Sequence, residues 1–195
     1  MLIREHLNHW FSLKAYYLAK TVSDIPIQIL FAAMYLVIVY IMSYQPMNAV
    51  HFLSLLGMTI CMALVGQGIG LFFGAAFDIQ VAVFLSPTCA IPFVLICSFC
   101  VNLNSLPYYL NWIGNISFMQ HGFDGSLLSI YGYDRPPLSC SEPYCYFRYP
   151  QKFLEQFHLH QSYSYFWPFS GMLVIFLVLR VSTYLVLRFK LRHMR

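Results

Sequence analysis

The stretch IPIQILFAAMYLVIVYIMSY, residues 25–44, decides the fold of this chain because it is long, apolar and free of charge. The same character continues well beyond it, since Asp78 is the one charged side chain between Ile25 and Phe123. A bilayer core about 30 Å thick is crossed by roughly 20 apolar residues in a helix, and a charge buried there costs at least about 2.5 kcal/mol. The sequence therefore predicts a protein that lies in a lipid bilayer.

The overall composition supports this prediction. Of the 195 residues, 59% are hydrophobic and 9% are charged, against about 25% charged residues in an average globular domain. We expect an all-α integral membrane protein, because a helix satisfies its own backbone hydrogen bonds in lipid. The N-terminal residues mix charged and aromatic side chains and lack the apolar core of a signal peptide. A net charge of +4 on scattered residues does not favour a nucleic-acid partner.

The lengths of the apolar segments and the turn residues between them predict four transmembrane helices. The first covers residues 25–44 and is closed by the turn Gln45-Pro46-Met47-Asn48, and the second covers 51–76. The third covers 80–101 and contains two prolines, which predict a kink that neighbouring helices accommodate. The fourth covers 167–187 and is followed by a basic tail. The chain is divided accordingly into segments 1–24, 25–101, 102–166 and 167–195.

The positively charged residues predict the orientation of these helices. An even number of spans puts both termini on one side, and basic residues near the termini outnumber those in the long loop before the last span. By the positive-inside rule both termini are cytosolic and residues 102–166 form an extracytosolic loop. The terminal basic residues are Arg4, Lys14, Lys20, Arg188, Lys190, Arg192 and Arg195, and those of the loop are Arg135, Arg148 and Lys152.

The long loop carries two further signals. Cys140 and Cys145 are predicted to form a disulfide with each other, because an extracytosolic loop faces an oxidising compartment. A bridge to a second chain is the alternative. Residues 106–133 are too interrupted by glycine to span and too apolar for water, so we expect short re-entrant helices there.

Three other features lie at or within the predicted helices. Residues 1–20 carry apolar side chains at helical spacing, which predicts an amphipathic helix on the cytosolic surface. In the second span, Gly66, Gly70 and Gly74 recur every fourth residue and predict a face on which another helix packs closely. Arg180 in the last span is a candidate functional charge, although we favour snorkelling towards the basic end or an ion pair.

No catalytic or metal-binding constellation stands out in the sequence. His158 and His160 lie two residues apart without a neighbouring set of acidic or cysteine ligands. The C-x-x-C of Cys97 and Cys100 lies in an apolar helix, where packing is the plainest role. The sequence therefore predicts neither a catalytic residue nor a metal site.

The order of several motifs resembles one known family. Residues 4–20, REHLNHWFSLKAYYLAK, are similar to the cytosolic coupling helix of the G (White) subfamily of ATP-binding cassette half-transporters. The resemblance covers essentially the whole chain and is closest to the branch that exports sterols and phospholipids. The other matching segments are Asp24-Ile25-Pro26, Ser98-Phe99-Cys100-Val101, His121-Gly122-Phe123-Asp124-Gly125, the loop of Cys140 and Cys145, and Tyr184-Leu185-Val186-Leu187-Arg188.

The resemblance also indicates what these residues do not contain. A complete member has an N-terminal nucleotide-binding domain and then six spans, so this chain would open between the second and third of them. No Walker A, signature or Walker B segment is present in the 195 residues. We expect no cofactor in this chain, with ATP and Mg²⁺ held by a nucleotide-binding domain elsewhere. Although the family hydrolyses ATP, the chain alone is expected not to.

Individual residues receive roles from the resemblance. Glu5, in the coupling helix, would transmit closure of the nucleotide-binding domains to the spans. Phe99 and Cys100 would close the outer end of the substrate cavity, where many members have two leucines or two phenylalanines, so Cys100 is a departure. Gln120-His121 is a second departure, because relatives often carry Arg-Tyr there. The residues implied to line the cavity are Pro87, Ile91, Val94 and Leu95.

The implied function is the membrane part of an ATP-driven lipid or sterol exporter. Such a domain would pair as a homodimer or heterodimer with another half-transporter, in the plasma membrane or an endomembrane. A stand-alone four-span scaffold or negative regulator that pairs with a full half-transporter is the alternative. A membrane-embedded enzyme fits poorly, because Asp24, Asp78 and Asp124 are isolated from one another in the sequence.

Overall fold

The computed structural model of the chain describes residues 13–45, 48–97, 116–132, 135–138, 145–146, 148–157, 159 and 164–193. Over these ranges the regular secondary structure is entirely helical, with no strand. The helices are α2 (Leu13–Met42), α3 (Ala49–Ala76), α4 (Ile79–Leu95), α6 (Phe118–Tyr131), α7 (Pro150–Gln156) and α8 (Phe166–His193).

Three of these helices are long and apolar enough to cross a membrane. They are α2, α3 and α8, which have 30, 28 and 28 residues. The helix at the predicted third span, α4, has 17 residues and is therefore about 26 Å long. That span was predicted to reach residue 101, and residues 98–115 lie outside the described part of the chain. The structure thus supports an all-helical integral membrane protein with three candidate spans and one shorter apolar helix.

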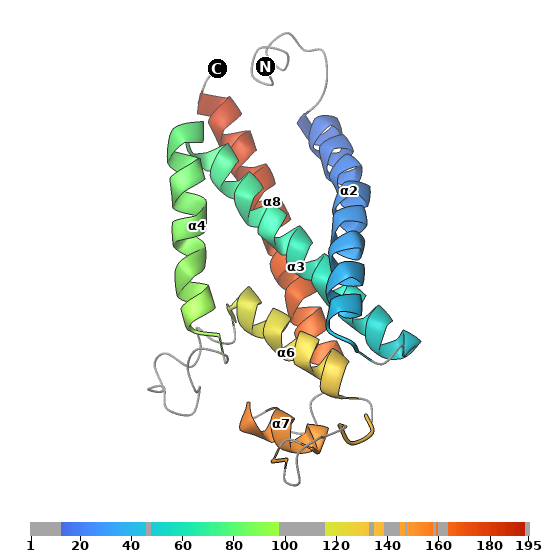
Figure 1. The fold of residues 1–195 in the computed structure, drawn as a ribbon. Helices are drawn as coiled ribbons and strands as arrows, with labels where there is room; N and C mark the ends of the chain where they lie inside the picture. Colours follow the sequence, from blue (N-terminus) through green and yellow to red (C-terminus); the bar gives the residue numbers. More distant parts are fainter. Residues whose placement is uncertain are drawn as a thin grey trace.

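The helices form a bundle with two distinct ends (Figure 1). One end, which we call the terminal end, holds the first turn of α2, the last turns of α8 and the turn between α3 and α4. The opposite end, which we call the α6 end, holds α6 and α7. The central helix is α3, because it contacts α2, α4, α6 and α8.

The core of the bundle lies along α3. Met58, Cys61 and Val65 of α3 are buried together with Phe118 of α6 and Met172 of α8. These side chains follow helical spacing, so one face of α3 meets both partner helices. Since apolar side chains gain little from leaving lipid, this contact is stabilised mainly by close van der Waals packing.

Glycines allow α6 to fit between α3 and α8. A Cβ atom built at Gly125 would overlap Cε of Met58, and one built at Gly122 would lie 2.5 Å from Sδ of Met62. On the other side, a Cβ atom at Gly171 of α8 would lie 3.0 Å from Nε2 of His121. The backbone of α6 therefore lies close to side chains of α3, and the backbone of α8 lies close to the His121 side chain of α6.

The glycines predicted to form a packing face have no such role among the described residues. Gly66, Gly70 and Gly74 are exposed, and a Cβ atom at any of them would meet nothing within 4 Å. Instead Gly68 faces α8, where a Cβ atom would lie 3.5 Å from Cβ of Leu179. Two positions along a helix correspond to about 200° of rotation, so α8 crosses α3 on the side opposite Gly66.

The start of α2 differs from the prediction. The first span was expected to begin at residue 25, after a surface helix over residues 1–20, but Leu13–Met42 is one helix with Pro26 inside it. The turns before the proline are held by side chains, since Lys20 pairs with Asp24 at 2.9 Å and the Thr21 hydroxyl donates to the Tyr17 carbonyl at 2.8 Å. Residues 13–20 therefore continue the span, and residues 1–12 lie outside the described ranges.

The C-terminal part of α8 caps the C-terminal end of α3. Nζ of Lys190 donates a hydrogen bond to the backbone carbonyl of Ala75 at 3.2 Å. Carbonyls in the last turn of a helix have no partner within the helix, and a lysine side chain is a favourable donor to them. The turn between α3 and α4 is thus fixed by a residue more than 100 positions later in the chain.

Candidate functional site

The residues implied to line the substrate path lie on an exposed face of α4. Ile91, Val94 and Leu95 have 55%, 42% and 56% of their surface exposed, and Pro87 is exposed as well. The contacts of α4 with α3 and α6 leave this face uncovered. A shallow groove of about 450 Å³ continues along the helix towards the terminal end, lined by Gln80, Val81, Phe84, Leu85 and Thr88.

A larger cavity lies on the other side of α4. It has a volume of about 980 Å³ and is partly enclosed by α3, α4, α6 and α8. On α4 it is lined by Cys89, Ala90 and Phe93. Ile91 and Leu95 come two positions after Cys89 and Phe93, which is about 200° around the helix. The helix α4 therefore stands between the predicted path and this cavity.

The cavity follows a regular stripe of α8. The lining residues recur at every third or fourth position from Trp167 to Leu179, a rise of roughly 18 Å. Two polar residues line it near the α6 end, namely His121 of α6 and Ser170, whose hydroxyl donates to the Trp167 carbonyl at 2.9 Å. The rest of the lining is predominantly apolar. The complete α8 stripe is Trp167, Ser170, Gly171, Val174, Ile175, Val178 and Leu179, and α3 adds Ile69, Phe72 and Phe73.

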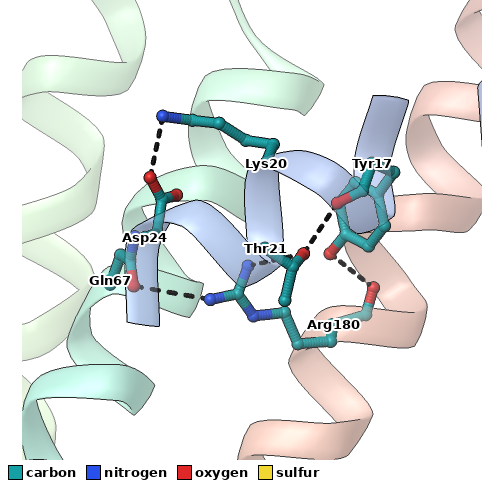
Figure 2. A network of polar contacts seen from close by, with 6 residues as sticks. All are labelled: Tyr17, Lys20, Thr21, Asp24, Gln67 and Arg180. Atoms are coloured by element: carbon teal, nitrogen blue, oxygen red, sulfur yellow. Dashed lines mark hydrogen bonds and ion pairs between the residues drawn. The ribbon is translucent and has the colours of Figure 1, made fainter. Parts of the chain in front are cut away.

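A polar cluster joins α2, α3 and α8 nearer the terminal end (Figure 2). Arg180 of α8 is only 7% exposed, and its Nη1 donates to Oγ1 of Thr21 at 3.3 Å while Nη2 donates to Oε1 of Gln67 at 3.4 Å. Its Cζ lies 5.1 Å from the ring centroid of Phe176. The remaining donor, Nε, is buried and makes no hydrogen bond.

Arg180 does not behave as the sequence suggested. Its burial excludes snorkelling, and no acidic side chain pairs with it among the described residues. Asp24, drawn in the same view, is bound by Lys20 instead, and theirs is the one ion pair in the described ranges. The favoured interpretation of snorkelling or an ion pair is therefore wrong for this structure. A buried cation without a carboxylate partner is costly, because neutral hydrogen bonds replace only part of its hydration.

The same cluster fixes the start of α2 to α8. The Tyr17 hydroxyl donates to the backbone carbonyl of Arg180 at 3.0 Å, as Figure 2 shows. The centroid of the Tyr17 ring lies 5.9 Å from the centroid of the Tyr184 ring. Tyr17 belongs to the segment that resembles the coupling helix. A displacement of that segment would therefore act directly on the last span.

We expect Arg180→Met to leave the thermal stability of the purified chain unchanged or to raise it, by about 1 kcal/mol or more. The substitution removes a buried charge that has no acidic partner. It keeps the hydrogen bond from the Tyr17 hydroxyl, because the acceptor is the backbone carbonyl of residue 180. Thermal melting in detergent measures the effect, and the exposed Arg188→Met serves as the matched control. A loss of about 3–5 kcal/mol would contradict the expectation, because that is the cost of breaking a buried ion pair.

A second buried charge lies in α6, which is not among the candidate spans. Oδ2 of Asp124 accepts a hydrogen bond from Nε2 of Gln120 at 3.0 Å, whereas Oδ1 is buried without a hydrogen-bond partner. Burial raises the pKa of Asp124 to about 6, and the Gln120 hydrogen bond opposes part of that rise. The carboxyl group therefore changes charge in the mildly acidic range.

Several predicted residues cannot be placed in this site. Glu5, Phe99, Cys100 and Cys140 lie outside the described ranges, so the coupling role, the gate and the Cys140–Cys145 disulfide stay predictions. Cys97 is buried, and its Sγ donates to the backbone carbonyl of Met119 at 3.9 Å, which agrees with a packing role. No cluster of three or more potential metal ligands occurs in the described part of the chain.

Sequence reasoning missed the cavity, the raised pKa of Asp124 and the partners of Arg180. One signal for the cavity was present in the sequence, because the α8 residues that line it recur at helical spacing along one face. That spacing does not reveal a void, since a filled core interface produces the same pattern.

Comparisons with known proteins show sequence similarity to membrane transporters. Residues 1–131 match the family model described as "ABC-2 type transporter". The chain is 32% identical over 125 residues to ABC transporter G family member 22 of Arabidopsis thaliana, an alignment that covers 63% of this chain and 16% of that protein. It is 23% identical over 195 residues to Protein white of Drosophila melanogaster, covering 99% of this chain and 28% of that protein.

A third relative is the ABC transporter ATP-binding protein/permease wht-1 of Caenorhabditis elegans. It is 26% identical over 125 residues, which cover 64% of this chain and 19% of that protein. The chain thus spans less than a third of the length of each of these three relatives.

Proposed function

Because the chain belongs to the ABC-2 type transporter family, we propose that it forms part of the translocation path of a G-type exporter of sterols and phospholipids. ATP would be hydrolysed by a nucleotide-binding domain outside these 195 residues. Two membrane domains would pair, as identical copies or with another half-transporter, and both termini would face the cytosol.

The exposed apolar face of α4 carries this proposal. Other helices also expose apolar side chains, but α4 differs from α3 and α8 in containing two prolines, Pro87 and Pro92, and in its surface groove. Proline removes a backbone donor and weakens the helix locally, which suits a helix that must bend. We place the path between the α4 faces of the two subunits, with Ile91 and Leu95 towards the cargo.

The proposed mechanism needs no acid, base or nucleophile. An apolar cargo gains about 25 cal/mol for each Å² of surface that leaves water, so an apolar path between two α4 helices binds it without specific hydrogen bonds. Nucleotide binding would favour one of two conformations of the pair and so drive alternation. The bonds that join Tyr17 and Thr21 of α2 to Arg180 of α8 support transmission of that movement to the spans.

The test is Ile91→Trp in the whole transporter that contains this chain. Tryptophan at this position would narrow the path, so ATP-dependent efflux of labelled sterol and phospholipid from cells should fall to background. Folding should survive, because Ile91 is exposed on α4 and its replacement displaces no buried neighbour.

Leu30→Trp is the matched control, since Leu30 is 59% exposed on α2 and lies away from the proposed path. It should leave efflux normal. Equal efflux from the Ile91→Trp and unmodified transporters would exclude α4 as the path. Absence of ATP-dependent lipid efflux from the unmodified transporter would exclude the proposed cargo.

A further inference from the structure

We propose that the last turns of α8 bind the head group of an anionic phospholipid at Arg188 and Arg192, on the outside of the bundle. The acyl chains would lie along exposed apolar side chains that precede these arginines on the same face of the helix. The lipid would be a resident of the membrane next to α8 and not the cargo. Its binding needs neither ATP nor transport, so the proposal goes beyond the exporter function.

One exposed face of α8, which we call the outer face, changes from apolar to basic along its length. Arg188 and Arg192 are both exposed and lie three residues after two of its apolar members. Residues three and four apart share one side of a helix. The apolar members recur every fourth residue and are 42–62% exposed, namely Leu177, Val181, Leu185 and Phe189.

The dimensions of the outer face fit a lipid. From Leu177 to Arg188 the helix rises about 17 Å. One leaflet contributes half of a hydrocarbon core about 30 Å thick, which is about 15 Å. Acyl chains that follow the apolar side chains therefore end near the level at which the arginines begin. A soluble anion would use the arginines alone and would leave the apolar part of this face unexplained.

The two arginines are available for a ligand. Neither makes a hydrogen bond or an ion pair with the residues that the structure describes. Lys190, which lies between them in the sequence, is directed to α3 by its bond to the Ala75 carbonyl. Like charges four residues apart on a helix repel each other, so this pair costs stability until an anion lies between them. A guanidinium group binds a phosphate through two parallel hydrogen bonds.

The surroundings of the arginines are positive as well. The acidic residues of the terminal end are Asp24, which is bound by Lys20, and Asp78, which makes no ion pair with a described residue. Lys14 of α2 is exposed one turn before Tyr17, and Arg188 comes one turn after Tyr184, whose ring contacts Tyr17. The two antiparallel helices therefore place Lys14 near the level of Arg188.

This charge favours an anionic over a zwitterionic head group. Each lysine or arginine near an anionic membrane surface strengthens binding roughly fivefold. The two arginines should therefore prefer phosphatidylserine to phosphatidylcholine by roughly 25-fold. If the termini are cytosolic, as proposed above, the lipid comes from the cytosolic leaflet, where anionic lipids are concentrated.

The experiment titrates the purified 195-residue chain, in uncharged detergent at low salt, with phosphatidylserine that carries a fluorescent acyl chain. A second titration uses phosphatidylcholine with the same acyl chains, so the ratio of the two dissociation constants isolates the head group. We expect the ratio to favour phosphatidylserine roughly 25-fold. The double variant Arg188→Gln and Arg192→Gln should lose this preference while its melting temperature in detergent stays unchanged, because both side chains are exposed.

Lys152→Gln is the matched control, since it removes an exposed positive charge from α7 at the α6 end. It should keep the preference. Equal affinity of the unmodified chain for the two lipids would overturn the proposal, as would an unchanged preference in the double arginine variant.

A competition experiment separates a lipid from a soluble anion. Glycerophosphoserine has the same head group without acyl chains and should displace the fluorescent lipid only weakly. Displacement by glycerophosphoserine as efficient as that by phosphatidylserine would show a soluble-anion site and reject the lipid. The titrations depend neither on the orientation of the chain nor on transport. A chain that shows the expected preference in a transporter without lipid efflux would support this site and contradict only the export proposal.

Discussion

Gly125→Leu should strongly destabilise the bundle by separating α6 from α3. A Cβ atom at this position overlaps Cε of Met58 and lies 3.0 Å from its Sδ, and Met58 is completely buried. Overpacking of this kind typically costs about 1–3 kcal/mol, and leucine adds three further carbon atoms to the clash. The purified chain should therefore melt at a clearly lower temperature in detergent.

Gly70→Leu supplies the matched control for this prediction. Gly70 is exposed on the same helix as Met58, and a Cβ atom there meets no described atom within 4 Å. Replacement of a mid-helix glycine by a better helix former should raise stability by up to about 1 kcal/mol. Similar melting temperatures for Gly125→Leu and the unmodified chain would show that α6 does not pack on α3 as described.

Asp124→Asn should stabilise the chain at pH 8 and leave it nearly unchanged at pH 4. The pKa of Asp124 rises from 3.8 to about 6 because the carboxyl group is buried, so the folded chain holds a proton that the unfolded chain releases. Stability from this group is fully present below pH 3.8 and is lost as the pH rises through about 6. Above about pH 6, the free energy of unfolding of the unmodified chain should therefore be about 3 kcal/mol lower than it is below pH 3.8.

Urea unfolding of the purified chain across pH 4 to 8 measures this effect. Asparagine keeps an oxygen that can accept from Gln120 and carries no charge, so the pH dependence should flatten in Asp124→Asn. Glu155→Gln is the matched control, because Glu155 is exposed on α7. An unchanged pH profile in Asp124→Asn would show that this carboxyl group is solvated in the folded chain.

The helices of the bundle could be predicted from the sequence where the length of an apolar segment is enough to define a helix. The second span was expected over 51–76 and is Ala49–Ala76, and the last was expected from 167 and begins at Phe166. The start of α2 was placed too late, because a proline such as Pro26 is typical of the first turn of a helix when the sequence is considered alone. The contacts that carry the helix through it, at Tyr17 and Thr21, depend partly on α8.

The site could be predicted only in part, since it depends on how helices cross. The α4 residues implied to line the path are exposed on one face of the helix, and their role in a path stays a prediction. Spacing of four residues singled out Gly66, but the crossing of α8 on the far side of α3 makes Gly68 the contact. Arg180 near a basic tail suggested snorkelling, and only the positions of Thr21 and Gln67 reveal its burial.

The bond from Lys190 to Ala75 has a consequence for the order in which the chain matures. During synthesis, α3 and α4 enter the membrane long before residue 190 leaves the ribosome. The last turn of α3 therefore lacks the Lys190 cap until the tail is complete, and the hairpin with α4 is secured only at that moment. A nascent chain stopped short of Lys190 would present a frayed α3 terminus to the machinery that inspects membrane proteins. The cap on the last turn of α3 thus depends on the completed tail of α8.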